Sequence, residues 1–125
     1  MKFTLDKHEK YVLVKLEESK LNTLNSAQLK SEFIVLNNEG FKNLILDLKN
    51  VKYIDSSGLS SILVANRLCK TLGGTFVITH ANPIIGKLVA ISRLENILTL
   101  LESNEEAIDL VFMEELEREF RGHVE

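Results

Sequence analysis

Alternating apolar and polar residues near the start of the chain predict two short β-strands. Phe3 and Leu5 alternate with polar neighbours, and alternation returns from Tyr11 to Leu16. The polar stretch His8-Glu9-Lys10 separates the two runs. Strands this close in sequence are expected to pair antiparallel, so a sheet that also holds parallel strands would be mixed.

A first helix is predicted after a polar, turn-like segment at 19–25. Ser26 is expected to cap it, and the helix runs to about Asn38, shortly before Gly40. Its apolar positions follow helical spacing and are Ala27, Leu29, Phe33, Ile34 and Leu36. The short apolar run 43–48 that follows is typical of a buried strand.

The rest of the chain continues to alternate between helix and strand. A long helix is predicted to open after Asp55 and to continue to Leu72, where Gly73-Gly74 ends it, and Thr75-Phe76-Val77-Ile78-Thr79 is predicted as the next strand. Asn82 is a candidate cap for a helix that starts at Pro83 and runs to about Ser92.

The last elements are a weak strand and a long amphipathic helix. The strand spans Ile97 to Leu101, and Ser103 or Asn104 caps the helix. The helix carries on one side Ile108, Val111, Phe112, Leu116 and Phe120. The whole pattern predicts an α/β fold: a mixed sheet of four to five strands packed against about four helices, with an extended C-terminal helix. The acidic cluster 114–119 is interpreted as a solvated helix face.

Composition limits the classes of function. With 125 residues, 45% hydrophobic and 26% charged, the chain fits one soluble globular domain over 1–125. A net charge of -3 lacks the basic field that nucleic-acid binding needs. No apolar run approaches the roughly 18–20 residues that span a bilayer. The single cysteine, Cys69, excludes an internal disulfide and is expected on the core side of its helix. We therefore expect a cytoplasmic protein without metal, cofactor, membrane or nucleic-acid partner.

Asp55-Ser56-Ser57-Gly58 stands between a strand and the long helix. Asp55 suits the N-cap position, where its carboxylate accepts hydrogen bonds from free amides of the first turn. A phosphoryl group on a serine here would meet the same amides and the positive end of the helix dipole. The same four residues could equally be a plain cap with a tight turn.

The helix itself predicts a docking patch. At about 100° per residue, one side is expected to face the core through Ile62, Ala65, Leu68, Cys69 and Leu72. The opposite arc then combines two leucines with polar residues, namely Leu59 and Leu63 among Ser60, Asn66, Arg67, Lys70 and Thr71. Leucines on a polar face beside a phosphorylatable serine indicate a partner-binding surface, although single exposed leucines are common.

Residues 43–72, NLILDLKNVKYIDSSGLSSILVANRLCKTL, resemble the STAS-domain anti-sigma factor antagonists. In that family a hydrophobic strand leads into Asp-Ser-(Ser/Thr)-Gly-(Leu/Ile) and a long helix. The resemblance covers about 3–112 and leaves a helical extension at 113–125. It implies that Ser56 is the phosphoacceptor, supported by Asp55, Ser57 and Gly58, and that Leu59 meets a kinase partner.

One stretch departs from the family pattern. The family often has Gly-x-Leu-Asp after the second strand, and this chain has Ser19-Lys20-Leu21-Asn22. Asn22 therefore stands in place of an aspartate that helps to shape the phosphorylation site. An amide can hydrogen-bond but carries no charge, which puts kinase recognition and rate in doubt but not the fold.

The resemblance implies partner switching. An anti-sigma factor with a histidine-kinase-like serine kinase fold would bind the chain while Ser56 is free and then phosphorylate it. A serine phosphatase would reset the switch, and the unphosphorylated form would free a sigma factor for transcription. The alternative is a non-phosphorylated STAS adaptor of a transport or lipid-trafficking complex. The amphipathic last helix could also pair in a homodimer.

An enzyme is the third hypothesis, and the sequence does not favour it. A serine hydrolase would need a base near Ser56 or Ser57, whereas His8, His80 and His123 lie in polar sequence and are expected at the surface. A carboxylate pair of Asp47 and Asp55 is less simple than a strand residue plus an N-cap. The chain also has neither a Gly-x-Ser-x-Gly elbow nor a Walker-type phosphate loop.

Overall fold

The computed structural model describes residues 1–124, with side chains through residue 122, and has a mixed five-stranded sheet at its centre. The strand order is β1-β2-β4-β6-β7. β1 (Phe3–Lys7) pairs antiparallel with β2 (Val12–Leu16), as the alternation predicted. β4 (Leu44–Asp47), β6 (Phe76–Thr79) and β7 (Thr99–Leu101) then follow in parallel register.

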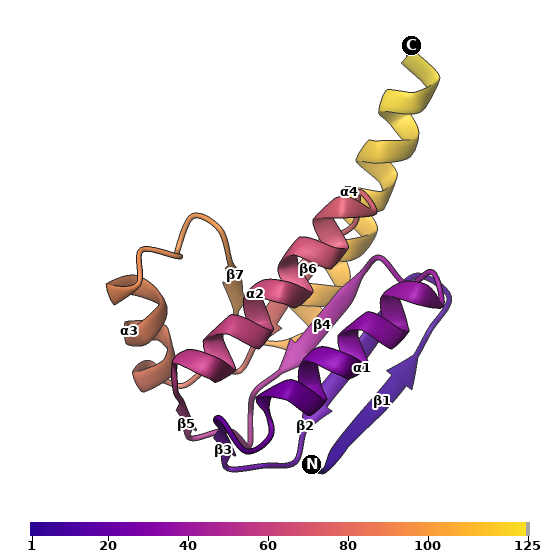
Figure 1. Ribbon diagram of the computed structural model, residues 1–125. Helices are drawn as coiled ribbons and strands as arrows, with labels where there is room; N and C mark the ends of the chain where they lie inside the picture. Colours follow the sequence, from indigo (N-terminus) through magenta and orange to yellow (C-terminus); the bar gives the residue numbers. More distant parts are fainter. Residues whose placement is uncertain (125) are drawn as a thin grey trace.

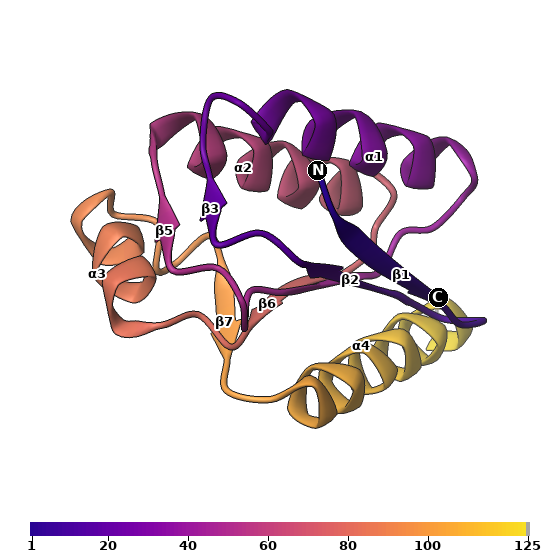
Figure 2. The same cartoon turned by 90° about the horizontal axis from the view of Figure 1, so that it is seen from below.

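Helices cover both faces of this sheet (Figures 1 and 2). α1 (Ser26–Asn38) and α2 (Ser56–Thr71) lie side by side on one face, and α4 (Asn104–Val124) lies on the other. α3 (Pro83–Ile91) sits at the side of the molecule beside the start of α2. The expected α/β fold with a mixed sheet and a long C-terminal helix is confirmed.

The strands divide the interior into two cores because successive side chains of a strand point to opposite faces. In β4, Leu44 and Leu46 pack under α1 and α2, whereas Ile45 packs under α4. β6 repeats the pattern, with Val77 on the α4 side. A strand buried on both faces reads as a continuous apolar run, which is why β4 was recognisable in the sequence.

A second, two-stranded sheet was not predicted. β3 (Lys20–Leu21) pairs in parallel with β5 (Tyr53–Ile54). β3 lies inside the segment 19–25, which the sequence analysis predicted to be a turn. The pairing is extended by Lys52 N donating to Ser19 O at 2.8 Å and Asp55 N donating to Leu21 O at 3.2 Å. Two-residue strands are too short to show a period-2 pattern, so only the tertiary structure reveals them.

The helix caps match the predictions at three of the four helices. Asp55 caps α2, and the Asn82 side chain caps α3 by accepting from Ile85 N at 2.9 Å. The Ser103 hydroxyl accepts from Glu106 N at 3.2 Å at the start of α4. The cap predicted for α1 is wrong: Asn25 holds the N-cap position without a side-chain cap bond, and Ser26 is the first helical residue and is buried.

Several expected core positions prove exposed. Ala27 and Ile34 lie on the outer side of α1, while Leu29, Phe33 and Leu36 form its buried stripe. Leu72 follows the end of α2 and is exposed as well. In α1 the buried stripe is narrower than the apolar sequence suggested, because the side of the helix that carries Ala27 and Ile34 faces away from the core.

The acidic segment of α4 is only partly a solvated face, which corrects the prediction. Glu115 Oε1 accepts from Asn43 Nδ2 at 2.7 Å and from Arg118 Nη2 at 3.1 Å, and it lies 3.6 Å from Lys42 Nζ. Glu114 accepts from the Thr75 hydroxyl. Burial raises the pKa of Glu115, but these hydrogen bonds and cations outweigh burial and leave the pKa lowered. Across the described residues, no helix is long and apolar enough to cross a membrane.

Candidate functional site

The site is built around the N-cap of α2. Asp55 has an extended backbone, with φ -98° and ψ -174°, and its Oδ1 accepts from Gly58 N at 2.9 Å and from the Ser57 hydroxyl at 2.8 Å. The hydrogen bond from Gly58 N, followed by that from Ser57, lowers the pKa of Asp55. The carboxylate is therefore ionised at neutral pH and holds the first turn of α2 in place.

Thr23 joins this site from a segment more than thirty residues earlier in the chain, and the sequence analysis missed it. Its hydroxyl donates to Asp55 Oδ2 at 3.3 Å and lies 3.4 Å from the Ser57 hydroxyl. The pairing of β3 with β5 brings the two segments together. The sequence offered one indication, since Ser19-Lys20-Leu21-Asn22 departs from the family pattern Gly-x-Leu-Asp. That departure related this turn to the phosphorylation site but did not identify Thr23.

Ser56 is the first residue of α2, and its side chain is exposed. It therefore stands at the positive end of a 16-residue helix, next to backbone amides of the first turn. Ser57 differs, since its hydroxyl is engaged by Asp55 and Thr23 and it is half-buried. The Ser56 hydroxyl is therefore available to other molecules, whereas the Ser57 hydroxyl contributes to the structure of the site.

Gly58 lets α2 approach β3 and β5 closely. A Cβ atom at this position would lie 2.5 Å from Leu21 O, 2.9 Å from Leu21 Cγ and 2.8 Å from Ile54 Cγ2. No side chain fits at such distances without movement of the backbone. The glycine thus supports the site through packing, not through an unusual backbone conformation.

Asn22 shapes the turn between β3 and α1. Its Oδ1 accepts from Leu24 N at 3.0 Å, and its carbonyl accepts from Ser26 N at 2.8 Å. The backbone N–H of Asn22 donates to Asn25 Oδ1 at 2.9 Å. These local bonds fix the turn that carries Thr23, so Asn22 supports the site from one residue away.

The exposed leucine patch predicted on α2 is wrong. Leu59 is only 9% exposed and belongs to the core, Asn66 is buried, and Leu63 is half-buried against the core. Leu59 lies at the edge of a buried arc that runs through Gly58, Ile62, Ala65 and Cys69, and it belongs to the same core cluster as Leu21 of β3 and Ile54 of β5. Ser60, Arg67 and Lys70 are exposed, as predicted.

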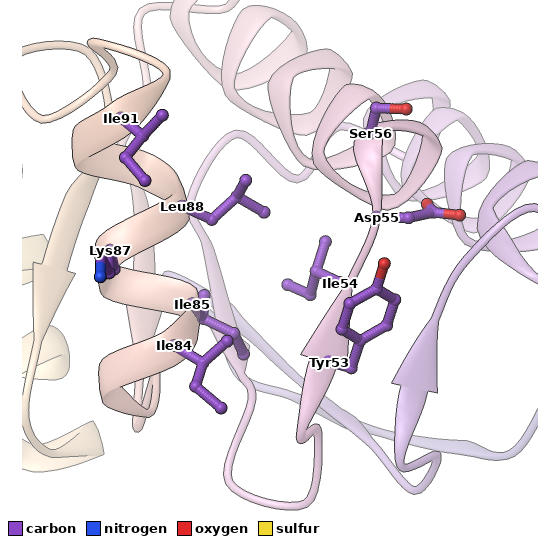
Figure 3. Close-up of a pocket in the computed structure, with 9 residues that line it drawn as sticks. All are labelled: Tyr53, Ile54, Asp55, Ser56, Ile84, Ile85, Lys87, Leu88 and Ile91. Atoms are coloured by element: carbon purple, nitrogen blue, oxygen red, sulfur yellow. The ribbon is translucent and has the colours of Figure 1, made fainter.

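An apolar groove lies on the other side of Ser56 instead (Figure 3). It separates β5 and the start of α2 from α3 and has a volume of about 520 Å³. Its rim carries Tyr53, Ile84 and Ile91, which are 51%, 64% and 69% exposed. The groove is lined in full by Tyr53, Ile54, Asp55, Ser56, Ile84, Ile85, Lys87, Leu88 and Ile91. Sequence reasoning missed it because α3 was not known to lie beside α2.

The remaining candidate residues form no hydrolase site within the described part of the chain. His8 is exposed and stacks on Tyr11, and the side chain of His123 lies outside the described residues. His80 is half-buried, contrary to the prediction, with Nδ1 4.0 Å from Asp47 Oδ1. Asp47 is buried and accepts from Asn104 Nδ2 at 3.0 Å instead of pairing with Asp55. Burial raises the pKa of the Cys69 thiol to about 12, so it remains a neutral core group.

Sequence comparison places the chain in a family. The STAS domain family model matches residues 2–107, so the chain belongs to the STAS domain family. One relative is BtrV of Bordetella bronchiseptica, named as an anti-sigma factor antagonist. It is 28% identical over 107 residues, which cover 86% of this chain and 91% of BtrV.

Solved structures agree on the fold. TM1081 of Thermotoga maritima, named as an anti-sigma factor antagonist, matches with a TM-score of 0.79 at 25% identity, over 87% of this chain and 93% of TM1081. The Bacillus cell fate determinant SpoIIAA in its phosphorylated form matches with a TM-score of 0.70 at 22% identity, over 88% of this chain and 99% of SpoIIAA. BtrV and TM1081 are thus both named as anti-sigma factor antagonists.

Proposed function

We propose that this chain is an anti-sigma factor antagonist whose binding to an anti-sigma factor is switched off by phosphorylation of Ser56. The observation that carries the proposal is the exposed Ser56 side chain at the start of α2, on the rim of an apolar groove. Support comes from the names of BtrV and TM1081 and from the phosphorylated form in which SpoIIAA was solved.

The groove is the surface that we assign to the partner, in place of the leucine patch. Tyr53, Ile84 and Ile91 are half to two-thirds exposed around it, and Leu88 and Ile54 form its floor (Figure 3). A partner side chain seated here would lie beside Ser56, whose hydroxyl points away from α3 (Figure 3). Exposed Ser60, Arg67 and Lys70 extend the same surface along α2.

A phosphoryl group on Ser56 would change this surface more than it changes the fold. It adds about -1.5 to -2 charges beside the ionised Asp55 carboxylate and at the edge of the groove. The helix dipole and first-turn amides partly compensate the charge within this chain. A partner packed against the groove has no such compensation, so the charge weakens the complex by repulsion and desolvation.

The transfer step needs a kinase partner with bound ATP. The Ser56 Oγ would attack the γ-phosphorus, forming an Oγ–P bond while the bond to the β,γ-bridging oxygen breaks and ADP leaves. The hydroxyl proton passes to a base on the kinase. A serine phosphatase then hydrolyses the phosphoester with water, which restores the binding form and frees a sigma factor from the anti-sigma factor again.

The test is phosphorylation by purified anti-sigma kinases encoded in the source genome. Wild-type chain and Ser57→Ala should gain one phosphoryl group with ATP, measured by intact mass, and Ser56→Ala should gain none. Ser56→Asp should bind the same kinase at least tenfold more weakly than Ser56→Ala does. Equal binding by these two variants would overturn the proposal.

The adaptor hypothesis makes the opposite prediction. If the chain is a non-phosphorylated subunit of a transport or lipid-trafficking complex, phosphate on Ser56 is absent in the native cell under every growth condition. Mass spectrometry of the endogenous protein decides between the two functions.

A further inference from the structure

α4 has a second apolar face that the domain leaves largely exposed. Ala107 and Val111 pack on the sheet. On the opposite side Phe112, Met113, Leu116 and Phe120 are 48%, 64%, 67% and 69% exposed. We call these four residues the outer stripe. Part of the stripe, with Glu117 and Arg121, encloses a surface hollow of about 420 Å³.

The outer stripe is held rigidly. Glu115 binds Asn43 and Arg118, Glu114 binds Thr75, and the Phe112 ring packs edge-on against Tyr11 at 6.3 Å between centroids. These bonds attach α4 to the sheet as far as Arg118. Beyond that point the helix projects past the sheet at the end where α2 finishes (Figure 1). A partner would therefore meet a preformed helix surface with little ordering cost.

We propose that the outer stripe binds the outer stripe of a second copy of this chain, with the two α4 helices antiparallel. Met113, Leu116 and Phe120 have the three- and four-residue spacing of a coiled-coil seam. Pairing Leu116 with the partner copy's Phe120 places the two domains at opposite ends of the helix pair, which avoids a clash because α4 projects.

The area is sufficient for a dimer of modest affinity. Aromatic side chains bury about 150–250 Å² each, so the exposed parts of the stripe offer on the order of 400–500 Å² per chain. Two copies together, with the stems of Glu117 and Arg121, approach the lower end of specific interfaces at roughly 1,200 Å².

Charge permits the antiparallel orientation. In an antiparallel pair each flank of the seam meets the same flank of the partner copy, so Glu117 lies near both the Glu117 and the Arg121 of the partner copy, and the two Arg121 side chains offset the contact between the two glutamates. Within one chain the same two residues form an ion pair at 3.6 Å, so the flank as a whole is neutral. The neighbouring glutamates also disfavour an anionic membrane as the occupant.

Sedimentation of the full chain over a micromolar concentration series tests the interface. The wild type should shift from monomer to dimer, and Leu116→Glu should remain monomeric. Ile97→Glu is the matched control, because Ile97 is also about half exposed and belongs to the segment between α3 and β7, not to α4, and it should dimerise like the wild type. A wild-type monomer at every concentration, or equal dimerisation by Leu116→Glu, would overturn the proposal.

Cross-linking tests the orientation. In the antiparallel pair, the two residues at position 117 lie on one flank within a few ångström along the axis, so Glu117→Cys should form a disulfide-linked dimer on mild oxidation. Cys69 is buried and does not compete. A dimer that fails to cross-link would contradict the antiparallel arrangement. Because Ser56→Ala should dimerise normally, failure of this proposal is separable from failure of the proposed switch.

Discussion

Gly58 and Thr23 show how single residues hold the switch site together. The first provides space and the second provides a hydroxyl, and both act on the contact between the β3 segment and the start of α2. The exposure of Ser56 depends on neither residue. The first turn of α2, which carries Ser56, depends on both for its contact with the β3 segment. Gly58 and Thr23 therefore support the structure of the site, whereas Ser56 carries its proposed chemistry.

Replacing Gly58 by alanine should destabilise the fold by about 1–3 kcal/mol, because the new Cβ meets the Leu21 carbonyl and something must shift. Urea unfolding measures the loss. Gly86→Ala is the matched control, since it is also helical and has nothing within 4 Å of the added Cβ. This control should be neutral or more stable by roughly 0.5–1 kcal/mol. Equal effects of the two substitutions would refute the close-packing account.

The Asp55 cap should make stability depend on acid pH. Its pKa is lowered in the folded state by the hydrogen bond from Gly58 N and then that from Ser57. The stabilisation is therefore fully present above the unfolded pKa, about 3.9, and is lost as pH falls through the folded pKa. Thermal melts of wild type and Asp55→Ala should differ at neutral pH and converge in strong acid. A difference that is independent of pH would argue against an ionised cap.

At the scale of elements, α4 is attached at both ends of its contact with the sheet. Asn104 binds Asp47 and Thr79 at its start. Glu114, Glu115 and Arg118 bind Thr75 and Asn43 about two to three turns before its exposed end. The part of α4 after residue 112 is therefore attached to the domain, since Glu114, Glu115 and Arg118 form hydrogen bonds with polar groups at the edge of the sheet.

Glu115→Ala should cost about 1–2 kcal/mol in unfolding free energy, because Asn43 and Arg118 each lose a charge-assisted partner. Glu119→Ala, an exposed acid on the same helix, should change stability by less than about 0.5 kcal/mol. Because the pKa of Glu115 is lowered when folded, its advantage over Glu115→Gln should shrink as pH falls below about 4.3. Denaturant titrations at two pH values measure both effects, and indistinguishable Glu115 and Glu119 variants would contradict the attachment.

In the whole molecule, the proposed surfaces lie on different sides. The groove beside Ser56 adjoins α3 and the start of α2, whereas the outer stripe lies on α4, across the sheet and toward the end of α2 (Figures 1 and 2). A dimer formed through α4 would leave both Ser56 side chains accessible. Two linked switches could then engage a partner that is itself dimeric with a gain in avidity.

Measurements of both stability and binding show whether the partner binds at the groove or at Leu59. Leu59→Ala should cost about 2–3 kcal/mol, because it removes a core side chain. Ile91→Ala should leave stability within about 0.5 kcal/mol and weaken binding of the anti-sigma kinase instead. If Leu59→Ala left stability intact but abolished binding, the exposed leucine patch would have been the better account.

The sequence alone determined the order of the helices and of the strands of the five-stranded sheet, the caps at Asp55 and Asn82, and the candidate serine. Each depends on interactions within a few residues, such as strand alternation and the bond from a cap to its first turn. The tertiary structure decided the pairing of β3 with β5, the burial of Leu59, the arrival of Thr23 and the groove beside α3. These depend on which distant segments meet, and helical spacing cannot show which neighbour covers the edge of a helix face.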